Sequence, residues 1–316
     1  HIREAGSTAV QELAFTLANA LAYVDAAITK GMDIDVFAPR LSFFFNCHND
    51  FFEEIAKFRA ARTLWHDLIE QRYQPKNPKS KMLRFHTQVA GVSLTAQQPL
   101  NNVARVTIQA LAAVIGGTQS LHTNSYDEAL GLPTEASATV ALRTQQIIAE
   151  ESGVADTVDP IAGSWHVERL TKEIYEQAHS IIEQIEEKGG AMAAIEEGWQ
   201  QQEIHLAAYQ HLNEIENDTR RIVGVNHGTM DEIEGIPVMK TDASLGERQT
   251  ERLAELRAQR DDQAVAEALE AVALSAENGS NLFPYVIEAV RARATLGEII
   301  NVLKARFGTY MAPSGF

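Results

Sequence analysis

Cysteine, positive charge and long apolar runs are all scarce in this sequence. The 316 residues include one cysteine, Cys47, so no intrachain disulfide can form, which favours a reducing, cytoplasmic location. There are 27 lysine and arginine residues against 43 aspartate and glutamate residues, and the net charge of −16 argues against nucleic acid and anionic membranes as partners. No apolar run approaches the roughly 18 residues of a membrane span, and we find no signal peptide.

Two nucleotide-binding motifs are also missing. The sequence contains neither GxGxxG nor GxxxxGK[ST], which argues against dinucleotide and P-loop chemistry. The composition is typical of a globular protein, with 45% hydrophobic and 22% charged residues. The hydrophobic residues are numerous enough to form a sizeable core. Residue 1 is histidine and an amphipathic helix pattern follows almost at once, so we expect the chain to begin inside a larger protein.

Helix and strand patterns alternate through the first half of the chain. A capping box at Thr8 and Gln11 opens a helix that Gly31 ends. Three short strand patterns follow, each with a helix pattern after it, which is typical of parallel β/α units. The predicted strands are 41–45, 83–88 and 118–124, and the predicted helices after them begin at Asp50 or cover 102–115 and 134–152.

Beyond Asp159-Pro160 the sequence becomes mainly helical. We therefore predict a division into residues 1–153, the β/α units, and residues 154–316, a mostly helical extension. The long helical patterns are 167–188, 191–216, 244–277 and 283–307, with short strand patterns at 222–226 and 236–239.

Polar residues line one side of the predicted strands. Arg84, His86 and Gln88 share a face, because side chains alternate along a strand. A parallel strand that is buried on both faces is apolar on both, so this set indicates a site of the kind that TIM barrels form at the carboxyl ends of their strands. The alternative is a set of hydrogen-bonded polar residues in a core. The third strand repeats the signal with Ser120, His122 and Asn124, while Gln119 faces the other way.

Histidines near the predicted strand ends leave a metal site open as an alternative. A metal-dependent hydrolase on a TIM barrel would place His and Asp ligands there, but no HxH or HExxH spacing supports it. We expect Cys47 to be a small buried thiol rather than a nucleophile. The histidines concerned are His1, His48, His86 and His122, with Asp50 close by.

Several segments together resemble the methylmalonyl-CoA mutase family of adenosylcobalamin-dependent acyl-CoA mutases. The most specific is the run GGTQSLHTNS at residues 116–125, which resembles the end of the family's eighth barrel strand. The resemblance covers nearly the whole chain. Its other segments are HIREAG at 1–6, PRLSFF at 39–44, RFHTQ at 84–88, DEAL at 127–130, EESG at 150–153, Asp159-Pro160 and IVGVN at 222–226.

The resemblance implies a fold and a reaction. Residues 1–153 would be the C-terminal part, the last three β/α units, of an acyl-CoA-binding TIM (β/α)8 barrel, and residues 154–316 a helical extension that contacts the barrel and a cobalamin-binding partner. The family's enzymes are isomerases that rearrange the carbon skeleton of a short-chain acyl-CoA by radical chemistry with adenosylcobalamin. The substrate would be methylmalonyl-CoA or succinyl-CoA, or of the isobutyryl- or 2-hydroxyisobutyryl-CoA type.

The same resemblance implies roles for individual residues. His1 would be catalytic, donating a hydrogen bond to the thioester carbonyl. Glu128 would contact the cofactor, although Ser125 and Glu128 also form a capping-box pattern that offers a purely structural alternative. No metal ligand is expected. The CoA-binding set is Arg40, Ser42 and Phe44, and the cofactor-binding set is Arg84, His86, Gln88, Gln119 and Glu128.

Parts of the family's enzyme are expected outside this chain. The first barrel strands and the Asp-x-His-x-x-Gly signature of the cobalamin domain are not found in the sequence, and the stretch 45–50 resembles the family branch with separate subunits. We therefore predict that the chain alone is inactive. It would need the N-terminal half of the barrel and a separate small cobalamin-binding subunit, in a heterodimer or heterotetramer. A further alternative, of another class, is a non-catalytic helical interaction scaffold.

Overall fold

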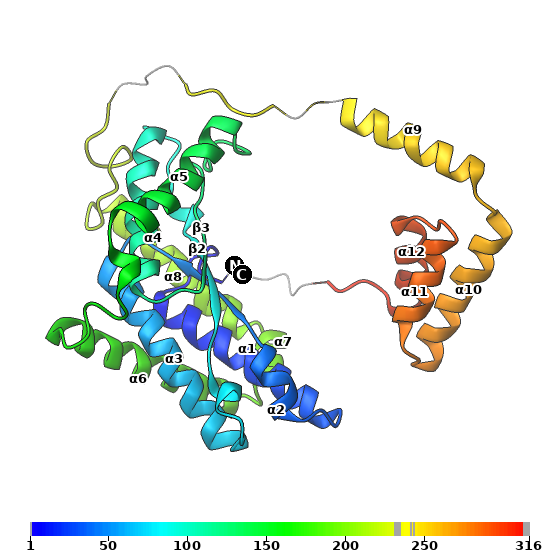
Figure 1. Ribbon diagram of the computed structural model, residues 1–316, viewed down its shortest axis with the longest axis horizontal. Helices are drawn as coiled ribbons and strands as arrows, with labels where there is room; N and C mark the ends of the chain where they lie inside the picture. The colour runs from blue at the N-terminus through cyan, green and yellow to red at the C-terminus, as the bar shows by residue number, and fades with distance from the viewer. Residues whose placement is uncertain (1, 231–234, 241, 243, 312–316) are drawn as a thin grey trace. The chain divides into compact units, whose positions relative to one another are not determined.

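In the computed structural model, three short strands pair in parallel in the order β1-β2-β3 (Figure 1). They are β1 (Phe43–Cys47), β2 (Phe85–Val89) and β3 (Ser120–His122). The register aligns Phe44 with His86 and Ser120, and Asn46 with Gln88 and His122. The parallel pairing confirms the predicted β/α units. The structure describes residues 2–230, 235–240, 242 and 244–311, which belong to two compact units, 1–239 and 240–315.

The helices of the β/α units begin and end close to where the sequence predicts. Thr8 and Gln11 form the predicted capping box at the start of α1, and Asp50 accepts a hydrogen bond from the Glu53 amide at the start of α3. The helix α4 ends where Gly116 and Gly117 follow it. The helices are α1 (Ala9–Thr29), α2 (Ile34–Phe37), α3 (Phe51–Tyr73), α4 (Asn102–Ile115) and α5 (Glu135–Glu151).

One face of the sheet is buried against helices and contributes much of the core. Phe58 of α3 stacks on Phe85 with ring centroids 5.0 Å apart, and Trp65 meets the ring of Phe43 edge-on at 4.8 Å. In β2, Phe85, Thr87 and Val89 are buried while the residues between them are half-buried. The same core cluster includes apolar residues of α1, α3 and α6 (Trp165–Glu187), so these helices and the sheet share one hydrophobic core.

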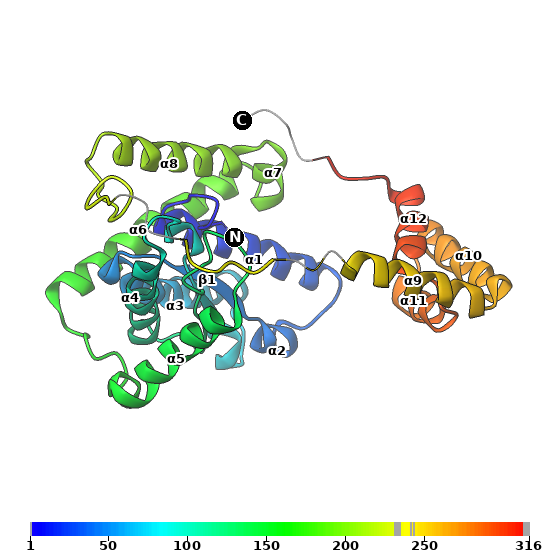
Figure 2. The same cartoon turned by 90° about the horizontal axis from the view of Figure 1, so that it is seen from above.

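A layer of helices follows the β/α units. It consists of α6 (Trp165–Glu187), α7 (Ala191–Glu196) and α8 (Trp199–Glu216), and Figure 2 shows α7 and α8 running beside α1. Helix α8 packs directly on the N-terminal segment, because a Cβ at Gly6 would lie 2.5 Å from the Cβ of Ala208. The strand patterns predicted at 222–226 and 236–239 are wrong. Val223 forms only an isolated bridge with His227, and 236–239 has no regular structure.

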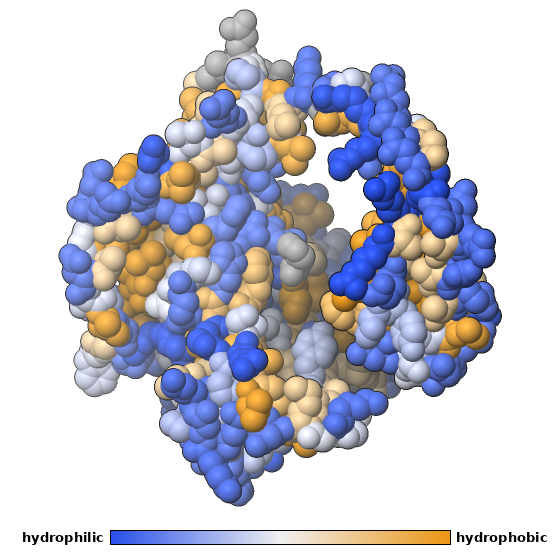
Figure 3. All heavy atoms as spheres, turned by 45° about the vertical axis from the view of Figure 1, so that its right-hand side comes forward, coloured by the Kyte–Doolittle hydropathy of each residue, from blue (hydrophilic) through white to orange (hydrophobic). Residues whose placement is uncertain are grey.

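The second unit is helical throughout its described elements. It contains α9 (Ser244–Gln259), α10 (Asp262–Asn278), α11 (Leu282–Arg291) and α12 (Leu296–Phe307). The last three pack around a small core that includes Val272, Ala289 and Ile299. Thr295 and Glu298 form the capping box expected at the start of α12. Figure 3 shows that the visible face of each unit is largely hydrophilic and is interrupted by apolar patches.

The fold is therefore α/β, with mostly helices around a small parallel sheet. None of the helices described is both long enough and apolar enough to cross a membrane.

Candidate active site

The face of the sheet opposite the helices carries a ladder of polar and aromatic side chains. The first row is Phe44, His86 and Ser120, in which the His86 Nδ1 atom lies 2.6 Å from the Ser120 Oγ atom and the His86 ring lies 5.4 Å from the Phe44 ring. The second row is Asn46, Gln88 and His122. Phe44 has 41% of its surface exposed, although a ring of this size is usually buried. Ser120 and His122 are exposed and His86 and Gln88 are half-buried, whereas Asn46 is buried, so this face is available to a ligand or to further chain except at Asn46.

A second group of polar residues lies at the carboxyl ends of the strands. Gln88 donates to the Asn124 Oδ1 atom at 3.0 Å, and Asn124 donates to the Val89 carbonyl at 2.9 Å. A Cβ at Gly91 would meet the Asn124 Nδ2 atom at 3.1 Å and the Glu128 Oε1 atom at 3.5 Å. Partial burial, with the nearby Glu4 and Asp127, raises the pKa of Glu128 above its usual value. We call these residues, together with Glu4, the carboxyl rim.

Other predicted site residues lie at the amino ends of the strands. Arg40 and Ser42 precede β1, and Arg84 precedes β2, where it donates to the Leu41 carbonyl at 3.4 Å. The Gln119 side chain accepts from the Phe85 amide at 2.6 Å and donates to the Gly117 carbonyl at 3.2 Å. These residues are exposed, but Gln119 is bonded locally at the end opposite Glu128.

The predicted residues thus lie on the same sheet, but they are spread over its open face and both ends of its strands and do not meet at one end. His86 and Gln88 are on the open face, Glu128 is on the carboxyl rim, and Gln119 is at the amino ends. His1 lies outside the described residues. The structural alternative for Glu128 is not realised, because residues 126–130 form turns and the next helix begins at Glu135 with Thr134 as its cap. The binding and catalytic roles of the set stay predictions.

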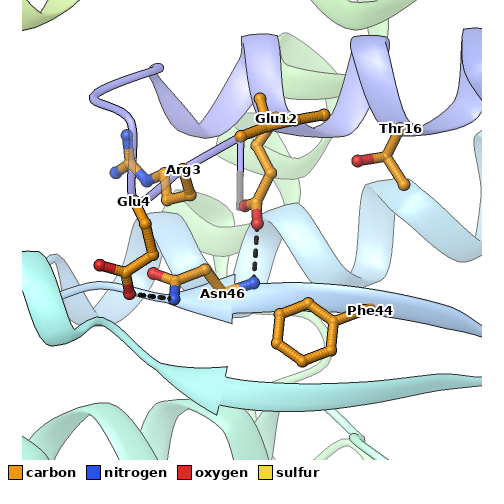
Figure 4. Close-up of a pocket in the computed structure, with 7 residues that line it drawn as sticks. Arg3, Glu4, Glu12, Thr16, Phe44 and Asn46 are labelled. Carbon is orange, nitrogen blue, oxygen red and sulfur yellow. Dashed lines mark hydrogen bonds between the residues drawn. The ribbon is translucent and has the colours of Figure 1, made fainter. Parts of the chain in front are cut away.

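Sequence reasoning missed a buried charge cluster beside β1, part of which lines the pocket in Figure 4. Lys57 is fully buried, and its Nζ atom lies 2.5 Å from carboxylate oxygens of both Glu12 and Glu54. Lys57 also donates to the Asn46 carbonyl at 2.7 Å, while Glu12 accepts from the Asn46 amide at 2.7 Å. The cluster therefore fixes the backbone of β1 next to the carboxyl rim. The one available signal was the position of Lys57 next to core residues in the α3 pattern.

The pKa shifts in this cluster follow from burial and from two carboxylates sharing one ammonium. Burial raises the pKa of Glu12, and Glu54 adds to the rise, although Lys57 opposes it. Burial alone would lower the pKa of Lys57, but Glu12 and Glu54 outweigh it and the pKa is raised. The ammonium ion is thus held in its charged form.

His48 follows β1 and is kept neutral. Burial, Arg3 and His211 lower the pKa of His48 to about 3. The Asn49 amide donates to the His48 Nδ1 atom at 2.8 Å, so the neutral ring carries its proton on Nε2. His211 of α8 lies 6.4 Å away between ring centroids.

Over the described residues, no three His, Cys, Asp or Glu side chains gather as metal ligands, so the hydrolase alternative gains no support there.

These features define a class of protein: a parallel α/β protein with polar side chains on an uncovered sheet face and on its carboxyl rim. The family model described as "Methylmalonyl-CoA mutase" matches residues 1–309. The chain therefore belongs to the methylmalonyl-CoA mutase family.

Characterised relatives agree with this assignment. The chain is 47% identical over 312 residues to the 2-hydroxyisobutanoyl-CoA mutase large subunit of Aquincola tertiaricarbonis, a match that covers 98% of the chain and 56% of that protein. It is 48% identical over 315 residues to the methylmalonyl-CoA mutase of Escherichia coli, covering 99% and 44%. The mitochondrial methylmalonyl-CoA mutase of Homo sapiens is 46% identical over 314 residues, with 99% and 42% covered. The chain thus spans about half the length of these relatives.

Proposed function

We propose that this chain is part of the substrate-binding subunit of an adenosylcobalamin-dependent acyl-CoA mutase, an isomerase that rearranges a carbon skeleton. The observation that carries the proposal is the uncovered sheet face, with its polar rows, in a chain of this family. Both kinds of relative named above are acyl-CoA mutases. The acyl-CoA is of the methylmalonyl or succinyl type, or of the isobutyryl or 2-hydroxyisobutyryl type.

The three strands would be the last three of a TIM barrel. In the described residues the sheet ends at β1 and β3, and a face bearing Phe44, His86 and Gln88 would become the barrel interior once upstream strands closed it. Closure would also cover the strand edges that an open sheet exposes. We therefore propose that residues 1–153 are the C-terminal part of the acyl-CoA-binding barrel. The rest, 154–316, would be the extension that contacts the barrel and the cobalamin-binding partner.

The carboxyl rim fits the adenosyl group of the coenzyme. Gly91 has no side chain where a Cβ would crowd Asn124 and Glu128, so the rim is open beside a carboxylate and an amide. Glu128 can accept hydrogen bonds from ribose hydroxyls, and Gln88 can donate or accept beside it. When bound, the coenzyme supplies homolytic radical chemistry. Of the other residues in the predicted set, Arg84 and His86 lie on or near the open face, and Gln119 fits least because its side chain is bonded locally.

The substrate side rests on the N-terminal segment and on the residues before β1. We propose that His1 donates a hydrogen bond to the thioester carbonyl, and that Arg40 and Ser42 contact the phosphates of CoA. Phe44 would lie along the acyl-CoA chain. Arg40 and Ser42 are exposed, and Phe44 is the half-exposed aromatic residue of the open face, which supports these roles.

The proposed assembly includes a separate small subunit that carries the cobalamin. One relative is named as the large subunit of its mutase, which supports a subunit of that kind here. The assembly would be a heterodimer or heterotetramer that also contains the N-terminal half of the barrel. A cytoplasmic location is part of the same proposal, since the one cysteine, Cys47, is a buried free thiol.

The test is reconstitution. The chain, joined to the upstream half of its barrel, is combined with a cobalamin-binding small subunit and adenosylcobalamin. Isomerisation of methylmalonyl-CoA, isobutyryl-CoA and 2-hydroxyisobutyryl-CoA is then followed by chromatography. We expect turnover of one of these types, and none when the small subunit or the coenzyme is omitted. Absence of turnover with all of them, despite coenzyme binding, would contradict the proposal.

A further inference from the structure

Glu4 joins three parts of the chain at the carboxyl rim. Its Oε1 atom accepts from the Asn46 Nδ2 atom at 2.7 Å and from the Gly91 amide at 2.8 Å, and its Oε2 atom accepts from the Val92 amide at 2.7 Å. The carboxylate therefore holds the N-terminal segment, the end of β1 and the loop after β2 together. Figure 4 shows its contact with Asn46. Charge-assisted bonds of this kind are stronger than neutral ones.

The loop that Glu4 holds lies against the residues proposed to face the coenzyme. The Cβ position of Gly91 is 3.1 Å from the Asn124 Nδ2 atom and 3.5 Å from the Glu128 Oε1 atom. Glu4 is also three residues after His1, the residue proposed to face the thioester. Glu4 thus connects the segment that follows His1 in the sequence to the loop beside Asn124 and Glu128.

We propose that Glu4 is a positioning residue of the mutase reaction, which fixes the segment after His1 relative to the Gly91 loop and hence relative to Glu128. This inference rests on the proposed function. Its physical basis is that the reacting groups on the two sides must meet at a defined distance, and an error of about 1 Å can cost on the order of 10²-fold in rate. Asn46 is oriented by the same contact, because a carboxylate can only accept and so selects the amide nitrogen of Asn46.

The chain offers a matched control in Asp35 of α2. Its carboxylate also accepts three hydrogen bonds: from two consecutive backbone amides, Lys76 at 2.9 Å and Asn77 at 3.0 Å, and from the Ser80 hydroxyl at 2.9 Å. Asp35 joins α2, which precedes β1, to the segment before β2, and these three hydrogen-bond partners lie outside the carboxyl rim. Each carboxylate thus accepts from two consecutive backbone amides and one side-chain donor, so substitutions at Glu4 and Asp35 perturb the same number of hydrogen bonds in different places.

The experiment compares E4Q, E4D and D35N in the reconstituted enzyme. We expect E4Q to lower kcat roughly 10- to 100-fold while KM for the acyl-CoA stays within about threefold, because positioning and not ground-state binding is lost. E4D keeps the charge but is one methylene shorter, so its kcat should lie between those of E4Q and the wild type. D35N should keep the wild-type kcat even if its melting temperature falls as much as that of E4Q.

Each result decides the matter. A kcat within twofold of the wild type for E4Q, or equal losses of kcat for E4Q and D35N, would overturn the positioning role. If E4Q does not fold, the E4D enzyme carries the test, and a wild-type kcat for E4D would overturn the inference. A wild-type enzyme without mutase activity would overturn the proposed function together with this inference, whereas an active wild type with an unaffected Glu4 variant would overturn the inference alone.

Discussion

Lys57 is an unusual residue to find fully buried, and its surroundings explain how it is tolerated. The ammonium group contacts two carboxylates, Glu12 and Glu54, and donates to the Asn46 carbonyl. Taking such charges out of water is costly, so the cluster is stable only while all of its members are present. Its benefit is local order, because Glu12 and Lys57 together engage both backbone groups of Asn46.

The first prediction concerns the removal of this ammonium ion. K57M leaves the buried Glu12 without its ammonium partner and leaves Glu54 with the Arg3 guanidinium, 3.6 Å away, and breaking a buried pair in this way typically costs about 3–5 kcal/mol. We expect a loss of that size in the free energy of unfolding, measured by urea denaturation of the chain.

The control is K172M, since the Lys172 side chain is 75% exposed and pairs with Glu176 one turn away. Such a surface change should stay within about 0.5 kcal/mol of the wild type. Adding E12Q and E54Q to K57M should restore part of the loss, because no unpaired charge is then buried. If the triple variant recovers nothing, lost packing and not charge is responsible.

The second prediction concerns His1 in the reconstituted enzyme. A hydrogen bond to the thioester oxygen strengthens as that oxygen gains electron density, so its loss slows the chemical step more than it weakens binding. We expect H1A to lower turnover by about 10²–10³-fold with near-normal affinity for the acyl-CoA. A variant with unchanged turnover would remove His1 from the catalytic set. A lower melting temperature with normal turnover would give it a purely structural role.

The residues of the site were predictable to different degrees. The alternation around His86 and Gln88 follows from strand geometry, and the structure places both on the open face. Gln119 was assigned by resemblance, and its bonds to Phe85 and Gly117 depend on loop conformation that no periodicity reveals. Glu4 contacts the Gly91 loop across 87 positions of sequence, and such long-range partners cannot be read from local pattern.

At the scale of elements, the strands and the first helices follow from local signals because turns and caps bound them closely. The predicted helix 191–216 is instead two helices, since Gly198 adopts a φ of +77° between α7 and α8. The predicted helix 244–277 likewise breaks before Asp261, which caps α10 with its side chain. The predicted helix 283–307 is also two helices, because α11 ends at Arg291 and Thr295 caps α12. All three breaks are made by a few residues inside a strong helical pattern, and the average pattern conceals them.

The third prediction concerns the ion pair between Arg260, just before α10, and Glu298 of α12 in the second unit. Arg260 donates to both oxygens of Glu298, at 2.8 and 2.7 Å. Arg260 and the Thr295 amide lower the pKa of Glu298 from 4.5 to about 2. Because the folded-state pKa is depressed, the pair contributes stability above pH 4.5 that is lost as the pH falls toward 2.

We therefore expect helix α12 to exchange its amide hydrogens faster at pH 3 than at pH 5, after correction for the intrinsic exchange rate. Mass spectrometry of peptides from 296–307 measures this directly. The matched variant is E298Q, which has no titrating group at this position and should show a smaller pH dependence in the same peptides. Identical pH dependence in both proteins would show that other carboxylates cause the effect.

At the scale of the whole molecule, the family was predictable because long runs such as GGTQSLHTNS are specific, and the family match over residues 1–309 confirms it. The chain spans about half of its relatives. Our proposal that this three-stranded sheet is part of a larger barrel rests on its open polar rows and on the strand edges at its two ends, which further strands would cover.

The last prediction follows from this open sheet: the isolated chain should turn over no acyl-CoA, even with the small subunit and coenzyme present. Catalysis of this kind needs a site from which water is excluded, and the rows containing His86 and Gln88 cannot be enclosed by a sheet that ends at β3.

Adding the upstream half should restore turnover and slow amide exchange in β3 (Ser120–His122), whose outer edge would gain a neighbouring strand. Exchange is measured by mass spectrometry with and without that half. Turnover by the isolated chain would contradict the prediction outright, and unchanged exchange in β3 on addition of the upstream half would show that the barrel does not close at this edge.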